Sequence, residues 1–152
     1  MKNFIVFCLS LFSFLSFGQN LNPVKWEAVY KSKNNNEGEI IITAKIEKGW
    51  HIYSQNISPD AGPIPTSFIV SPGNNFELAS KILETNPIEI HDKAFDAKLM
   101  IFEEKGIFTQ KIKLKNIKGF NSIIKVEFMV CNDMQCLPPK TVDIAVNIPA
   151  VK

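Results

Sequence analysis

The sequence predicts an all-β, immunoglobulin-like antiparallel β-sandwich that follows a cleaved signal peptide. Three observations support this fold class. Short runs rich in β-branched and aromatic residues alternate between apolar and polar positions, which is typical of strands. Stretches rich in Asn, Gly and Pro separate these runs at short intervals, as turns do. No segment has the apolar periodicity of a helix of ten or more residues.

The N-terminal segment has the features of a targeting signal. Lys2 gives it a positive start, residues 4–17 are almost wholly apolar, and Gly18 and Gln19 follow. This apolar run is shorter than the roughly 20 residues that span a membrane. We therefore expect a signal peptide at residues 1–19 and one β-sandwich domain at 20–152, in the periplasm or otherwise exported. An uncleaved membrane anchor is the alternative.

Nine segments of the remaining chain have strand patterns. The clearest are an Ile-rich run and a later run in which Lys alternates with Ile and Leu. The most apolar one, residues 123–130, is expected to be an interior strand. Residues 89–96 are polar and are expected to form a loop. In order, the predicted strands are 24–30, 39–46, 49–54, 67–70, 76–78, 99–102, 107–114, 123–130 and 141–148.

The charge pattern argues against nucleic acid as a partner. The formal net charge is +2, and all 17 basic residues are lysine. Bidentate recognition of phosphate or guanine depends heavily on arginine, which this sequence lacks. The lysines alternate with apolar residues, as on the solvated face of a sheet.

Two cysteines remain once a signal peptide has been removed. Cys131 and Cys136 flank four mostly polar residues between two predicted strands, so a strand–turn–strand corner can bring them within disulfide distance. An exported protein meets an oxidising compartment, where such a pair forms a disulfide or a redox couple. A bridge that closes a loop of about six residues contributes only about 2 kcal/mol. The pair is therefore a weak structural link and is suited to opening and closing.

Spacing alone still favours a structural disulfide on a hairpin by a small margin. The pair does not match the C-x-x-C pattern of thioredoxin, and no further cysteine supports a four-ligand zinc site. Metal binding by the pair with His51 or His91 is a minor alternative. We expect no metal and no cofactor.

Two further segments contain residues that suit a site. In residues 49–54, strand alternation places Trp50 and Ile52 on one face and His51 and Tyr53 on the other. His51 and Tyr53 either lie partly in solvent or tune the cysteines through hydrogen bonds and charge. Phe95, in the polar segment 89–96, either anchors a loop on the core or covers a reactive group.

These segments, in this order, resemble the N-terminal periplasmic domain of the thiol:disulfide interchange reductase DsbD. The resemblance covers residues 24–148. It depends on the aromatic stretch 49–54, the segment His91-Asp92-Lys93-Ala94-Phe95, and a Cys-x-Pro-Pro signature that begins at Cys136. It implies an immunoglobulin-like domain that relays reducing equivalents through its cysteine pair.

The resemblance also implies roles for single residues. Cys136 matches the cysteine that forms mixed disulfides with partners, and Cys131 matches the one that resolves them. Phe95 matches the aromatic residue of a cap loop that shields the pair, and Asp92 partly matches the acidic residues of that loop. His51 and Tyr53 lie where family members have aromatic residues near the site.

The implied partners are thioredoxin-like domains and other exported thiol proteins. This sequence has four residues between its cysteines, where the best-known members have five. No membrane segments or thioredoxin-like domain follow the sandwich, so we expect a separate electron donor, such as a membrane reductase encoded elsewhere. The chain would then be a component of a protein-disulfide reductase. The alternative is a non-catalytic, immunoglobulin-like protein-binding module with a structural disulfide; ligand binding by Trp26 and Trp50 is a weaker third possibility.

Overall fold

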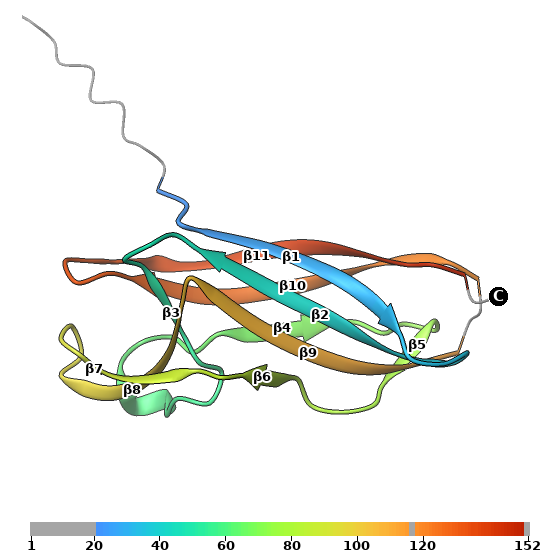
Figure 1. The fold of residues 1–152 in the computed structure, drawn as a ribbon, viewed down its shortest axis with the longest axis horizontal. Coiled ribbons are helices and arrows are strands. Elements are labelled where there is room, and N and C mark those ends of the chain that lie inside the picture. Colours follow the sequence, from blue (N-terminus) through green and yellow to red (C-terminus); the bar gives the residue numbers. More distant parts are fainter. Residues whose placement is uncertain (1–20, 116–117, 151–152) are drawn as a thin grey trace, which may run out of the picture.

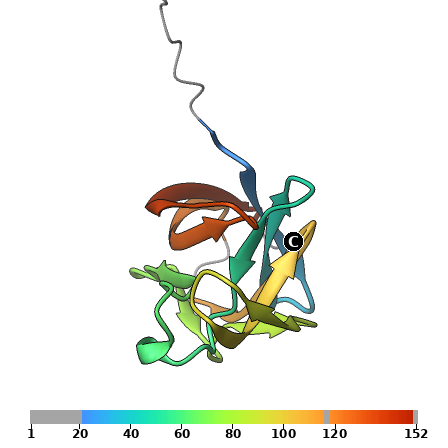
Figure 2. The same cartoon turned by 90° about the vertical axis from the view of Figure 1, so that its left-hand side faces the viewer.

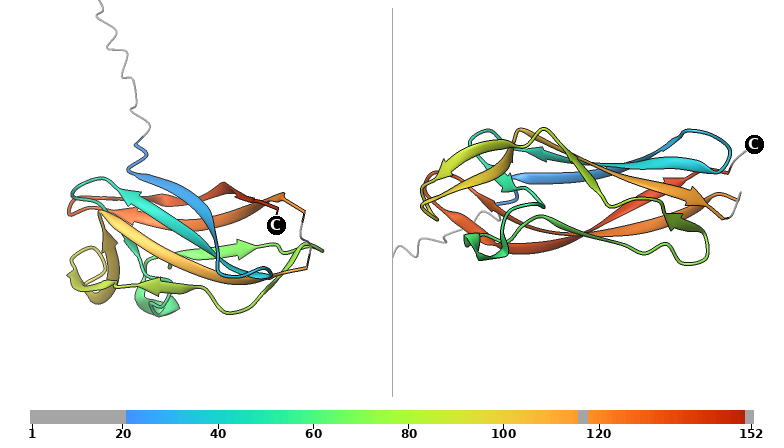
Figure 3. Two further views of the ribbon diagram at one scale, coloured as in Figure 1. Left: turned by 45° about the vertical axis from the view of Figure 1, so that its right-hand side comes forward. Right: turned by 90° about the horizontal axis from the view of Figure 1, so that it is seen from below.

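Two antiparallel β-sheets pack face to face, which confirms the predicted all-β sandwich (Figure 1 and Figure 3). The computed structural model describes residues 21–115 and 118–150, so the expected signal peptide at residues 1–19 lies outside the described residues. Within these residues the only helical element is a 3₁₀ turn, η1 (Pro59–Ala61). No helix in this part of the chain is long and apolar enough to cross a membrane.

The first sheet consists of two long antiparallel pairings with short strands at one edge. Its strands are ordered β1-β2-β9-β5, and β6 also pairs with β9. Alternating apolar residues on β2 and β9 point into the sandwich, so the sequence pattern sets the pairing register. The members are β1 (Val24–Ser32), β2 (Glu37–Ile46), β5 (Phe76–Leu78), β6 (Leu83–Thr85) and β9 (Lys105–Leu114).

The second sheet contains the site. Its order is β11-β10-β3-β8-β7, and β4 also pairs with β10. One edge of β10 pairs with β11, while β4 and β3 pair with different stretches of its other edge. The members are β3 (His51–Tyr53), β4 (Ser67–Val70), β7 (Ile88–Asp92), β8 (Ala97–Glu103), β10 (Phe120–Cys131) and β11 (Cys136–Ile148).

All nine predicted strands overlap strands of the structure, and two short strands were not predicted. β6 and β7 were missed, and the expected loop at residues 89–96 is wrong for its first half. That half belongs to β7, which pairs with β8, and the hairpin turn consists of residues 93–96 alone. Ile88 is 46% exposed, so this edge strand shows little of the apolar burial from which strands are recognised.

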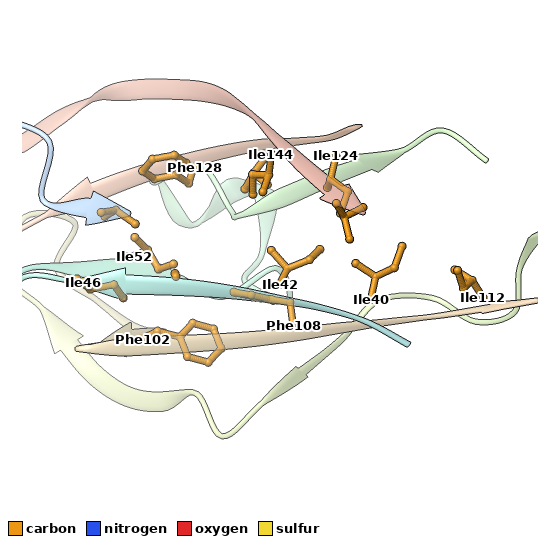
Figure 4. Close-up of a cluster of buried hydrophobic side chains, with 14 of the residues drawn as sticks. Ile40, Ile42, Ile46, Ile52, Phe102, Phe108, Ile112, Ile124, Phe128 and Ile144 are labelled. Carbon is orange, nitrogen blue, oxygen red and sulfur yellow. The ribbon is translucent and has the colours of Figure 1, made fainter. Parts of the chain in front are cut away.

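The main core lies between the two sheets (Figure 4). Ile40 and Ile42 of β2 and Phe108 of β9 meet Ile124 and Phe128 of β10 there. Trp26 lies against Phe108 and Phe128, with ring centroids 5.9 and 5.3 Å apart, and Trp50 also packs on this core. The two tryptophans thus have packing roles, which weakens the possibility that they bind a ligand.

A smaller apolar cluster lies on the outer face of the second sheet. Ile52 and Val130 belong to the main core, whereas the adjacent Tyr53 and Cys131 belong to the smaller cluster, because neighbouring side chains of a strand point to opposite faces. Ala61 of η1 and Phe95 of the turn between β7 and β8 pack against this cluster. We name it the end cluster; its buried members are Tyr53, Ile57, Leu99, Ile101 and Cys131, and Phe95 and Cys136 are among the partly buried residues packed against it.

The end cluster lies at the end of the sandwich where the chain enters β1. The β10–β11 turn and the β7–β8 hairpin lie at this end, and β11 ends at the other (Figure 1). Figure 2 shows the same end face-on, with η1 and the β7–β8 hairpin beside each other. A groove of about 390 Å³ lined by residues 21–24 and 137–140, among others, confirms that the entering chain lies beside the start of β11.

Candidate functional site

The two cysteines face each other across a β-hairpin. Cys131 ends β10, Cys136 begins β11, and the two are register partners joined by a disulfide with a Cα–Cα distance of 4.0 Å. Asn132 closes the turn between them. Its N–H donates to the Gln135 carbonyl oxygen at 2.9 Å, and its Oδ1 accepts from the N–H groups of Met134 and Gln135 at 2.9 and 2.8 Å.

The two sulfur-bearing residues differ in accessibility. Cys131 is 1% exposed and lies between β11 and β3, where its register partners are Cys136 and His51. Cys136 is partly exposed and lies on β11, the edge strand of the sheet. An incoming thiolate can therefore approach Cys136 more readily than Cys131.

β3 places two polar aromatic side chains beside Cys131. His51 is directly opposite Cys131, and Tyr53 belongs to the end cluster with it. Both are buried, with exposures of 8% and 0%, so the structure does not show the alternative in which they lie partly in solvent. His51 Nε2 lies 3.3 Å from the Tyr53 hydroxyl, and the two rings meet edge to face.

Asp92 is a buried carboxylate that connects β3 to the turn between β7 and β8. Its side chain is 4% exposed. Oδ2 accepts a hydrogen bond of 2.7 Å from the Tyr53 hydroxyl and lies 3.4 Å from His51 Nε2. Oδ1 accepts hydrogen bonds from the N–H groups of Ala94 and Phe95 at 2.8 and 3.2 Å. One carboxylate thus fixes the turn that contains Phe95.

These contacts set the protonation state of the network. Burial alone would raise the pKa of Asp92, but the hydrogen bonds from Tyr53, Ala94 and Phe95 and the nearby His51 together hold it below its usual value. Burial, followed by the hydrogen bond to Asp92 and its charge, raises the pKa of Tyr53. At neutral pH Asp92 is therefore an anion and Tyr53 a neutral hydrogen-bond donor.

Phe95 lies in the turn of residues 93–96, which we name the cap turn. Its ring contacts Tyr53 edge to face, with centroids 6.0 Å apart, and it packs against the end cluster that contains the disulfide. The ring also lies directly over Gly62, where any side chain would collide with it. Gly62 has φ of 106°, a conformation that glycine adopts without strain.

The cap turn and the turn of residues 132–135, which we name the cysteine turn, border the same small cavity. The cavity measures about 50 Å³ and is lined by residues of both turns together with the His51 and Asp92 side chains. The structure therefore brings together all six residues that the sequence indicated as a site. They are Cys131, Cys136, Phe95, Asp92, His51 and Tyr53.

Sequence reasoning missed the loop that supports Phe95 from the other side. Ile57 and Gly62 precede and follow η1, and both lie next to the cap residue or its cluster. A glycine between an alanine and a proline was the available signal, but this pattern is also typical of an ordinary turn.

His91 is exposed and pairs with Asp96 at 3.1 Å. Among the described residues, no group of three or more His, Cys, Asp or Glu side chains could hold a metal ion.

Replacing Phe95 with alanine is expected to expose the disulfide. The ring and Cys136 both pack against the end cluster that contains Cys131, and removal of the ring opens a path for small reagents. We expect reduction by dithiothreitol to become about fivefold to tenfold faster, with a stability loss of about 1–2 kcal/mol because the ring is only partly buried. Stopped-flow reduction and urea unfolding measure both quantities. A reduction rate equal to that of the wild type would show that Phe95 does not limit access.

Comparison with known proteins identifies a family and its fold. The model of the family "Thiol:disulfide interchange protein DsbD, N-terminal" matches residues 19–148. The reduced N-terminal domain of DsbD from Neisseria meningitidis superposes with a TM-score of 0.51 at 14% identity, over 88% of this chain and 92% of that one.

A second solved structure shows the same architecture. The N-terminal periplasmic domain of ScsB from Proteus mirabilis superposes with a TM-score of 0.51 at 18% identity. The match covers 84% of this chain and 47% of that one, so this chain corresponds to about half of it. At these identities the two structures demonstrate a common fold. A comparison with curated protein sequences gives no match.

Proposed function

The chain belongs to the family of DsbD N-terminal domains, a family of thiol:disulfide interchange proteins, and from this premise we propose that Cys131 and Cys136 relay reducing equivalents. The donor is a thioredoxin-like protein, and the acceptors are other exported thiol proteins. Residues 1–19 direct export, and residues 20–152 form the exchange domain. In this role the chain is a protein-disulfide reductase component that functions with a separate donor.

One observation carries this proposal: the disulfide joins a buried sulfur to a partly exposed one at the end of a hairpin. The paired strands continue from Cys131↔Cys136 to Phe120↔Ile148, so the hairpin does not need the bridge to stay closed. A loop of about six residues makes the bridge worth only about 2 kcal/mol. The pair can therefore change redox state while the sandwich stays folded.

The reductive half of the relay begins at Cys136. A donor thiolate attacks Cys136 Sγ, the Cys131–Cys136 bond breaks, and Cys131 leaves as a thiolate that takes up a proton. The second donor thiolate then attacks the donor sulfur of the mixed disulfide and releases the Cys136 thiolate. Two electrons pass to the chain, and the donor dithiol becomes a disulfide.

The oxidative half reverses these roles. The Cys136 thiolate attacks an acceptor disulfide, and one acceptor sulfur leaves as a thiolate. Cys131 then attacks Cys136 Sγ, restores the internal bridge and releases the second acceptor sulfur. The hairpin keeps Cys131 directly opposite Cys136, so this resolving step is intramolecular and fast. Phe95 must move away whenever a partner approaches.

Redox exchange with a thioredoxin tests this function. The oxidised mature chain is mixed with reduced thioredoxin, and free thiols are counted by alkylation and gel shift over a range of glutathione potentials. We expect rapid exchange and a reduction potential above about −300 mV. No exchange combined with a potential below about −300 mV would identify a structural bridge and favour the non-catalytic binding module.

A further inference from the structure

Met134 is the most exposed of the large apolar side chains in the described part of the chain. It is 89% exposed, whereas the next, Ile69, is 62% exposed. It lies in the cysteine turn between Cys131 and Cys136, two residues from Cys136. A side chain this exposed gains almost no stabilisation from packing within this domain. An apolar side chain in this position is better explained by an interaction than by the fold.

The cysteine turn holds Met134 in a defined place. Its N–H donates to Asn132 Oδ1 at 2.9 Å, and the N–H of the next residue donates to the same oxygen at 2.8 Å. The Asn132 N–H closes the turn through Gln135. The backbone is therefore organised before a partner arrives, which lowers the entropic cost of using the side chain for binding.

Any protein that forms a mixed disulfide with Cys136 must cover Met134. Two residues span at most about 7 Å between Cα atoms. A standard interface buries about 800 Å² on each partner, which corresponds to a disc of about 16 Å radius. With the sulfur–sulfur bond near its centre, Met134 falls in the inner half of that disc. The inner part of an interface is enriched in Met and poor in charged residues.

We propose that Met134 is a docking contact for the apolar surface that surrounds the attacking cysteine of a thioredoxin-like partner. This proposal rests on the relay proposed above. A relay must seat a donor and an acceptor in turn on the same sulfur. The unbranched thioether of methionine adapts to different apolar surfaces, so one side chain can serve both partners. Met134 is a docking contact that adapts to either partner, and it takes no part in the bond exchange.

Exchange kinetics with two reductants of different size test this contact. Met134→Gln preserves length and neutrality but removes the apolar surface. Ile69→Gln is the matched control, because Ile69 is also exposed and pairs with Lys125, about 20 Å along β10 from Cys131. The oxidised full mature variants are reduced either by thioredoxin or by dithiothreitol, and second-order rate constants are compared.

We expect Met134→Gln to slow reduction by thioredoxin about fivefold to tenfold, with dithiothreitol reduction and the reduction potential unchanged and with Ile69→Gln at the wild-type rate. Equal rates of reduction by thioredoxin for Met134→Gln and wild type would overturn the docking contact but not the relay. Equal slowing with both reductants would also overturn it, because the effect would then lie in the disulfide. Failure of the wild type to exchange with thioredoxin would overturn the relay, and this contact with it.

Discussion

Cys136→Ser is expected to abolish disulfide exchange, whereas Cys131→Ser is expected to accumulate mixed disulfides with thioredoxin-like partners. The reason is the difference in accessibility: Cys131 is 1% exposed, and Cys136 is partly exposed at the sheet edge. When Cys131 is absent, a partner sulfur bound to Cys136 can be displaced only by a second thiol of the partner, so the mixed disulfide persists with a partner that has a single cysteine. We expect each variant to lose exchange turnover by a factor on the order of 10³ or more.

Non-reducing gels and mass spectrometry distinguish the two cysteines after mixing with a thioredoxin that keeps only its attacking cysteine, activated as a mixed disulfide with thionitrobenzoate, which is the leaving group. The double variant Cys131→Ser/Cys136→Ser is the control for complexes that do not involve either sulfur. Equal trapping by both single variants would show that the partner reaches Cys131 as easily as Cys136. If neither variant traps a partner, the pair does not exchange with thioredoxins and the relay is wrong.

Asp92→Ala is expected to release the cap turn and to destabilise the domain by about 2–4 kcal/mol. Removal of the carboxylate leaves the Tyr53 hydroxyl and the N–H groups of Ala94 and Phe95 without their acceptor in a largely buried site. Urea unfolding measures the loss of stability. Because the cap turn loses its anchor, reduction by dithiothreitol should also become several-fold faster.

Asp96→Asn is a matched control for Asp92→Ala. Asp96 lies in the same cap turn, but its side chain is 93% exposed and its pairing with His91 is at the surface. Exposed ion pairs contribute little, so we expect a change within about 0.5 kcal/mol and an unchanged reduction rate. Similar losses for the two variants would show that the Asp92 network does not hold the cap.

The same network predicts a pH dependence. The folded-state pKa of Asp92 lies below its unfolded value, so the contribution of its charge is complete above an unfolded pKa of about 3.9 and is lost as the pH falls through the folded pKa. The stability advantage of the wild type over Asp92→Asn should therefore be constant from about pH 5 to pH 7 and shrink below about pH 4. Urea unfolding of both proteins at several pH values measures this difference. An advantage that grows in acid would contradict the assignment of Asp92 as the anion.

The alternation of apolar and polar residues along the chain predicted the sandwich, because every second residue of the long strands faces the main core. Ile40, Ile42 and Ile112 are almost fully buried, and their neighbours Glu39, Lys111 and Lys113 are not. The strand ends were less predictable. β11 begins at Cys136 and includes two prolines, because an edge strand can accommodate residues without an N–H donor.

Short strands and long-range contacts could not be predicted from the sequence, for a different reason. β6 has three residues, which pair with residues 107–109 of β9, so it has too few positions for a period to appear. The residue types of the site were visible, but the bond between Tyr53 and Asp92 joins residues 39 apart. The tertiary fold alone brings such groups together. Gly62 gains its importance in the same way, from the Phe95 ring above it.

The position of the disulfide at one end of the sandwich affects how far the cysteines can reach from a point of attachment. Leu21 lies beside the start of β11, next to the cysteine turn, whereas the other end of β11 lies about 40 Å away, at 13 residues of about 3.3 Å each. A tether at the C-terminal end would hold the disulfide away from the point of attachment and let it sweep a wide radius. A tether at the N-terminal end would hold it close to that point and raise the effective concentration of partners fixed there. The choice of end for immobilisation or fusion thus determines which partners the same cysteine pair meets.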